Sequence, residues 1–295
     1  MTRRQGADAR DTTGTMPLAD HLRELRKRLV ISMLAVGVGM VVAWFYYDQI
    51  FAFIRAPFDD VVAEAKEAGR DMTLAFTGVA DPFVMQLKVA AVVGMLMASP
   101  VWLYQLWRFI TPGLHRHERR WAMGFVAVAT PLFLAGAAMA YWVMPKGLEV
   151  LLGFTPENIE NIISVDRYLS FFLRMMLVFG VGFLLPLLVV SLNLAGVLSF
   201  ARLASWWRWI VMGVVVFAAA ATPTGDPFNL FLLAAPILAL MGLAAGVAWA
   251  NDRRRARRRA TQPQWADDET SPLGENPSPL DDQPSSLDDG AGHVR

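Results

Sequence analysis

Six long stretches without a charged residue constrain the fold of this chain more than any other feature. Each stretch has 17 to 27 residues, and about 20 helical residues cross the roughly 30 Å hydrocarbon core of a bilayer. Because a spanning segment must satisfy its backbone hydrogen bonds internally, each stretch is predicted to be a helix. The stretches are 29–47, 89–107, 121–145, 175–201, 209–225 and 227–251.

The composition agrees with a polytopic membrane protein. Of the 295 residues, 55% are hydrophobic and 18% are charged, whereas soluble domains have roughly 25% charged residues. This balance argues against a soluble enzyme and against a disordered chain. The absence of cysteine excludes disulfides, thiolate metal sites and cysteine nucleophiles.

The distribution of lysine and arginine predicts the orientation in the membrane. With the N-terminus inside, cytoplasmic segments contain 20 of the 27 basic residues, and the outer segments contain the other seven. An even number of spans then places both termini in the cytoplasm. We expect an all-α integral membrane domain at 18–250, flanked by disordered cytoplasmic segments at 1–17 and 251–295.

The loops and prolines add local detail. Residues 57–69 have helical spacing with a polar face, which predicts a short helix on the outer surface. Prolines at positions 100, 131, 186 and 236 are expected to kink four of the helices. The kinks either serve packing or curve the bundle into a concave face.

Few ionisable side chains lie near the predicted spans. Lys88 and Arg174 lie near the outer ends of their helices, where they either snorkel to the interface or form a polar floor beneath an outward cavity. The six stretches contain no Asp, Glu or His. This absence argues against a proton-coupled carrier, which usually needs a relay of such groups.

The first cytoplasmic segment, DHLRELRKRL at 20–29, predicts an amphipathic lead-in to the first span. Glu24 and Arg28 are four residues apart and are expected to pair on one helix face. An apolar stripe runs along the same segment through Leu18, Leu22, Leu25 and Leu29.

The second cytoplasmic segment, 109–120, begins with Phe109 and turns at Pro112. Glu118 stands among arginines that include Arg119, so it forms either a local salt bridge or part of a site. Two histidines, at 115 and 117, have no third ligand nearby, and no metal site or cofactor is expected. The basic run at 253–259 is interpreted as a topology anchor beside anionic lipid rather than a nucleic-acid site.

Taken together, these segments resemble the TatC family, the multispanning core of the twin-arginine protein translocase. The resemblance extends from residue 17 to about residue 250, and the combination of motifs is highly specific. It is carried by HLRELRKRL at 21–29, DPF at 81–83, SPVWLYQ at 99–105, WRFITPGLHRHERR at 107–120, YLSFF at 168–172, and the segments 179–186 and 222–226.

The resemblance implies a six-helix receptor shaped like a cupped hand, with both termini in the cytoplasm of a bacterial cell. It would bind twin-arginine signal peptides and export folded proteins across the plasma membrane, driven by the proton motive force, without being an enzyme. It also implies TatA-like and TatB-like single-span partners, contact with membrane lipid, self-association and no nucleic acid.

The family pattern also implies which residues act. The signal-peptide site would comprise Glu24, Leu25, Arg26, Phe109, Glu118 and Arg119. Further functional positions would be Pro57, Lys88, Gln105, Pro112, Arg174 and Asp226.

The chemistry of an Arg-Arg peptide supports a binding role for Glu24 and Glu118. A planar guanidinium binds a carboxylate through two parallel hydrogen bonds, which an ammonium cannot do. Two adjacent arginines therefore need two acids on one surface, and Glu24 and Glu118 are the natural pair. The chain departs from the family at Leu185, where many members carry an acid, so a mechanism that needs that carboxylate does not transfer.

Two rival functions are weighed against this one. Six kinked helices also suit a small-molecule secondary transporter, which would show polar groups at mid-membrane around a closed cavity. An intramembrane hydrolase would need paired Asp residues or a Ser–His dyad inside the spans, and the sequence has neither.

Overall fold

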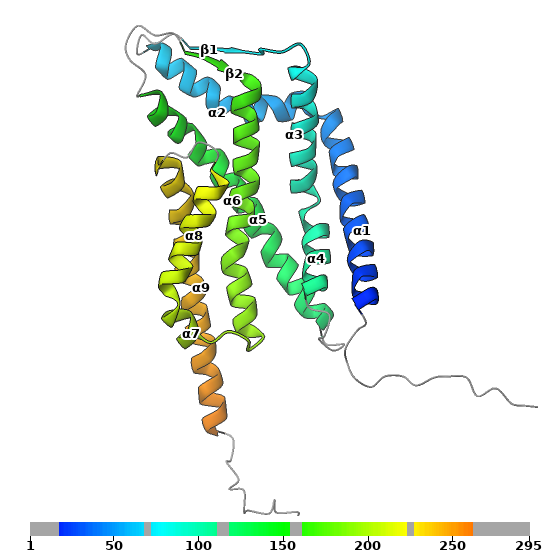
Figure 1. Ribbon diagram of the computed structural model, residues 1–295, viewed down its shortest axis with the longest axis vertical. Coiled ribbons are helices and arrows are strands. Elements are labelled where there is room, and N and C mark those ends of the chain that lie inside the picture. The colour runs from blue at the N-terminus through cyan, green and yellow to red at the C-terminus, as the bar shows by residue number, and fades with distance from the viewer. Residues whose placement is uncertain (1–17, 68–71, 111–117, 154–160, 223–226, 262–295) are drawn as a thin grey trace, which may run out of the picture. The chain divides into compact units, whose positions relative to one another are not determined.

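The computed structural model describes residues 18–67, 72–110, 118–153, 161–222 and 227–261. Within these ranges the chain is almost entirely helical (Figure 1). The helices are α1 (Leu18–Phe45), α2 (Tyr47–Glu67), α3 (Asp81–Met97), α4 (Ser99–Ile110), α5 (Glu118–Leu152), α6 (Val165–Leu194), α7 (Phe200–Ser205), α8 (Trp207–Ala221) and α9 (Pro227–Thr261). The strands are β1 (Met72–Ala75) and β2 (Asn161–Ser164).

Four of the described helices, α1, α5, α6 and α9, are long and apolar enough to cross a membrane. Helices α3 and α4 pass the same test together, as a pair bent by 61°. Helix α8 has 15 residues, which at about 1.5 Å per residue is shorter than the hydrocarbon core. The described residues therefore provide four spans, or five with the bent pair, where the sequence predicts six.

The bend between α3 and α4 occurs where a proline was expected to kink the chain. Pro100 is the second residue of α4, a position where its missing N–H costs no intrahelical hydrogen bond. Pro131, Pro186 and Pro236 instead lie inside the continuous helices α5, α6 and α9.

The helix predicted at 57–69 is longer in the structure. Helix α2 covers the whole of Tyr47–Glu67, with Pro57 in its interior. Its apolar face is buried rather than lying free on a surface, because Ile54 and Phe58 are only 2% and 1% exposed. The ring of Phe58 lies 4.6 Å from that of Tyr168 on α6, which ties the loop to the helical core.

Strands β1 and β2 join the segment after α2 to the segment before α6. They pair in parallel, with Thr73 opposite Ile162. Helix α6 begins directly after β2, so the pairing of Ala75 with Ser164 places the start of α6 next to the end of β1.

Two helix pairs approach so closely that only glycine fits at the crossing. A Cβ atom at Gly39 on α1 would lie 2.7 Å from the carbonyl oxygen of Gly94 on α3. One at Gly136 on α5 would lie 2.5 Å from the carbonyl oxygen of Phe179 on α6. Small residues let helix backbones meet and gain packing contacts where water provides no driving force.

The chain divides into two units, residues 1–251 and 252–295. In the first unit, the main core gathers around large buried side chains of α6, among them Phe172, Met175 and Phe179. In the second unit, the described residues continue α9 as a helix to Thr261. The helix therefore ends later than the predicted boundary at 250, because arginine and alanine favour helix and no proline occurs before Pro263. The expected disorder of 1–17 and of 262–295 concerns residues outside the described ranges.

Candidate functional site between α1 and α4

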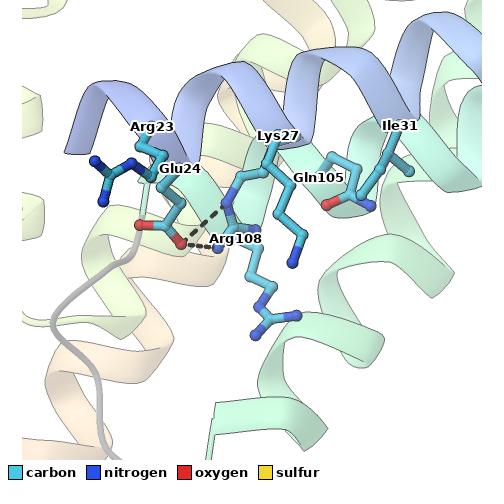
Figure 2. A pocket seen from close by; sticks show the side chains of 7 residues that line it. Arg23, Glu24, Lys27, Ile31, Gln105 and Arg108 are labelled. Carbon is cyan, nitrogen blue, oxygen red and sulfur yellow. Dashed lines mark hydrogen bonds and ion pairs between the residues drawn. The ribbon is translucent and has the colours of Figure 1, made fainter. Parts of the chain in front are cut away.

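A charged pocket lies between the first turns of α1 and the second half of α4 (Figure 2). Its volume is about 510 Å³. Four of the seven described residues that line it are cationic and one is acidic. The lining residues are Arg23, Glu24, Lys27, Arg28, Ile31, Gln105 and Arg108.

Helical spacing explains why these side chains meet. On α1, Arg23, Lys27 and Ile31 follow one another at intervals of four residues, and so do Glu24 and Arg28. Residues four apart lie on one face of a helix, so the two rows form a continuous wall. Helix α4 packs against α1 and supplies Gln105 and Arg108, which are three residues apart.

Glu24 and Arg28 form the ion pair that the sequence predicts. The Nε atom of Arg28 donates to Oε1 of Glu24 over 3.1 Å, and its Nη2 atom donates to the same oxygen. The side chain of Glu24 is 29% exposed, and that of Arg28 is 10% exposed. Because both bonds end on Oε1, the second carboxylate oxygen retains its capacity to accept hydrogen bonds from another group.

An aromatic contact joins the same two helix ends. The ring of His21 on α1 stacks on the ring of Phe109 on α4, with centroids 4.7 Å apart. Phe109 therefore holds the first turn of α1 against the end of α4, next to the pocket. The contact brings together two segments that lie 88 positions apart in the sequence.

The other predicted signal-peptide residues are only partly described. Leu25 and Arg26 are exposed on α1, but they do not line the pocket. Glu118 and Arg119 begin α5, and their side chains lie outside the described residues.

The remaining predicted positions are dispersed. Pro57 is buried within α2, and Arg174 is exposed on α6. Pro112 and Asp226 lie outside the described residues. Of the predicted set, the pocket therefore brings together Glu24 and Gln105.

Lys88 does not simply extend to the interface. Its Nζ atom donates to Oδ1 of Asp166 over 2.7 Å and to the hydroxyl oxygen of Ser170 over 2.8 Å. Both acceptors belong to α6, so the contact links α3 to α6. Lys88 therefore links two helices through an ion pair. Neither sequence-based interpretation, snorkelling to the interface or forming a polar floor, included this role.

Sequence analysis did not predict that Lys27, Ile31 and Arg108 belong to a functional site. Lys27 and Arg108 were counted only as topology determinants, since positive charge is expected near every cytoplasmic helix end. The four-residue spacing of Lys27 and Ile31 was the available signal, but only the packing of α4 reveals which face of α1 lines a pocket. Among the described residues, no group of three His, Asp or Glu side chains is placed to hold a metal ion.

The fold and the pocket define a helical membrane protein with a charged recess at the joined ends of two helices. Residues 20–236 match the family model described as Sec-independent protein translocase protein (TatC). The chain belongs to this family.

Relatives of known name support the assignment. The chain is 46% identical over 265 residues to the Sec-independent protein translocase protein TatC of Frankia casuarinae, covering 88% of this chain and 73% of the relative. It is 41% identical over 259 residues to that of Xylanimonas cellulosilytica, covering 88% and 93%. It is also 37% identical over 235 residues to the chloroplastic protein TATC of Arabidopsis thaliana, covering 79% and 66%.

A solved structure agrees in fold. The crystal structure of the twin-arginine translocase receptor TatC superposes with a TM-score of 0.67 at 33% identity, covering 79% of this chain and 99% of that one. A second structure of that receptor, in DDM, gives the same TM-score at 34% identity, covering 77% and 99%. None of these relatives supports a small-molecule transporter.

Proposed function

We propose that this protein is the signal-peptide receptor and core subunit of a twin-arginine translocase, which exports folded proteins across the bacterial plasma membrane. Membership of the TatC family supports the proposal, and so does the structural similarity to the twin-arginine translocase receptor TatC. The function is binding and assembly rather than catalysis.

The single observation that carries the proposal is the carboxylate of Glu24 in a pocket between α1 and α4. An incoming guanidinium would bind Oε2, because Arg28 already donates to Oε1. The bonds from Arg28 keep the carboxylate in one position, so little side-chain entropy is lost when the peptide binds. The surrounding cations repel basic peptides that cannot make this contact, which favours specificity.

The second arginine of the signal would bind Glu118. Glu118 is the first residue of α5, and α5 packs on α4, which forms one side of the pocket. Leu25, Arg26, Phe109, Arg119 and Pro112 would complete the peptide surface around the two acids. Of these, Phe109 has a described contact that supports its place, the stacking on His21 beside the pocket.

We propose that the membrane topology has six spans, with both termini in the cytoplasm. The bent pair α3–α4 and the short helix α8 would be the second and fifth spans, in agreement with the six uncharged stretches. The excess of arginine and lysine in the assigned inner segments supports this orientation. The kinked helices would form the cupped surface along which the apolar part of the signal lies.

Other subunits would complete the translocase. TatA-like and TatB-like single-span proteins would pack against the exposed apolar faces of the helices, together with lipid and other copies of this chain. Pro57, Arg174 and Asp226 would act on the outer side. Because Leu185 replaces the acid found in many members, the coupling to the proton motive force would not use a carboxylate at that place.

A peptide-binding experiment tests the receptor role. Full-length protein in nanodiscs is titrated with fluorescent peptides that carry Arg-Arg or Lys-Lys. We expect Glu24→Gln to weaken binding of the Arg-Arg peptide about tenfold, because a charge-assisted contact is lost. Glu64→Gln, which changes an exposed acid on α2, serves as the matched control and should bind like the wild type.

Glu118→Gln tests the second acid in the same titration. Wild-type affinity in both Glu24→Gln and Glu118→Gln would remove these carboxylates from the site. In cells without their own receptor, export of a folded reporter should follow the Arg-Arg signal and not the Lys-Lys signal. Equal export of both would contradict the proposed specificity.

A further inference from the structure

The pocket beside Glu24 also contains cationic side chains that the proposed contact with an arginine does not use. Arg28 and Glu24 balance each other as an ion pair. Two further charged residues of the described lining, Lys27 and Arg108, are both cationic. A recess of this charge attracts anions.

Lys27 and Arg108 come from different helices and point into the same space. Figure 2 shows both side chains extending from their helices in the same direction. Both are exposed, so their charged groups are accessible. Like charges that line one pocket repel each other, and an anion between them would replace this repulsion with two charge-assisted contacts.

The pocket also has an apolar side. Ile31 lies one helical turn beyond Lys27 and completes the lining on α1. Beyond Lys27 along the same helix, Val30 and Leu34 are 46% and 65% exposed. This order of side chains, charged and then apolar along a candidate span, matches the order of a phosphate group and an acyl chain in a phospholipid.

We propose that the pocket binds an anionic phospholipid, with its phosphate group between Lys27 and Arg108 and the start of an acyl chain against Ile31. A guanidinium and an ammonium are both strong donors to phosphate oxygens. The lipid site does not depend on the proposed peptide site, although the two share one pocket.

A phospholipid and free inorganic phosphate would both offer a phosphate group to this pocket. The experiment distinguishes between these two ligands. Delipidated full-length protein in detergent is titrated with dioctanoyl phosphatidylglycerol, and bound lipid is counted by native mass spectrometry. Parallel titrations use dioctanoyl phosphatidylcholine and inorganic phosphate as a competitor. No signal peptide is present, so the result is independent of the receptor role.

We expect one saturable phosphatidylglycerol site. The double variant Lys27→Gln/Arg108→Gln should bind that lipid about thirtyfold more weakly, because two cationic contacts are removed. The control Lys66→Gln/Arg208→Gln removes the same charge from exposed residues elsewhere and should bind like the wild type. The exchanged variant Lys27→Arg/Arg108→Lys keeps both charges and should retain binding.

Three outcomes of the lipid titrations would overturn the proposal. They are equal weakening by the control variant, equal binding of phosphatidylcholine, and displacement of the lipid by inorganic phosphate at equal concentration. Glu24→Gln distinguishes the two proposals, since it should retain the lipid while losing the Arg-Arg peptide. Loss of both ligands in that variant would show that the lipid does not bind as described.

Discussion

The ammonium nitrogen of Lys88 lies 2.7 Å from Oδ1 of Asp166, although 78 positions separate the two residues in the sequence. Their side chains are 38% and 30% exposed. The ion pair, together with the bond from Lys88 to Ser170, fastens α3 to α6 next to the β1–β2 pairing. The ion pair therefore links α3, part of the second predicted span, to α6, which contains the fourth predicted span.

Asp166→Asn is expected to lower the free energy of unfolding by about 1 kcal/mol, since a partly buried interhelical ion pair is lost. Thermal unfolding in detergent measures the effect. Asp59→Asn is the matched control, because Asp59 pairs with Arg55 on one exposed helix face and both side chains are about half exposed. A larger loss in Asp59→Asn than in Asp166→Asn would contradict the role assigned to the interhelical pair.

Gly94→Ala should destabilise the protein by about 1–3 kcal/mol, the usual cost of overpacking. The new Cβ atom would lie 2.5 Å from the backbone nitrogen of Met40, so α1 and α3 would have to separate. Gly37→Ala on α1 is the control, since its Cβ meets no atom within 4 Å, and alanine there favours helix by up to about 1 kcal/mol. Similar thermal stability of the two variants would disprove the close approach.

Glu24→Ala should destabilise the protein more than the double variant Glu24→Ala/Arg28→Met does. The single change leaves the guanidinium of Arg28, which is 10% exposed, without its carboxylate, at a cost of about 1–3 kcal/mol. The double change removes the unpaired charge and keeps an apolar stem of similar length. A double-mutant cycle by thermal unfolding measures the coupling, and additive losses would mean that the ion pair contributes nothing.

Phe58→Ala should cost about 3–5 kcal/mol of stability, because it leaves a cavity where a 1% exposed ring packs against Tyr168. Phe45→Ala, at a ring that is 80% exposed, should change stability by less than about 1 kcal/mol. The comparison tests whether α2 is part of the core. If Phe58→Ala unfolded at the wild-type temperature, α2 would instead lie loosely on the surface.

Local patterns predicted much of the architecture. The uncharged stretches at 29–47, 121–145, 175–201 and 227–251 correspond to the four helices that meet the length and hydropathy criteria for a span. The pair Glu24–Arg28 follows from four-residue spacing alone and was predicted correctly. Such features depend on residues within a few turns of one another, so the sequence contains all the information they need.

The same local patterns failed where distant segments decide the outcome. Helix α2 begins at Tyr47, ten residues before the predicted start at 57, because Ile54 and Phe58 pack into a core formed with other helices. The ion-pair partner of Lys88 was missed because Asp166 belongs to another helix. The bend between α3 and α4 was expected from Pro100, but the local pattern did not predict its angle of 61°.

By itself, the sequence determined that this chain is helical, enters a membrane and resembles one family, because hydrophobicity, helix periodicity and motif order are properties of consecutive residues. Only the tertiary structure decided that Glu24, Lys27, Gln105 and Arg108 line a common pocket. The reason is geometric: which face of α1 meets α4 depends on helix packing between segments about 80 residues apart. Counting charges along the chain therefore does not predict which face of α1 meets α4.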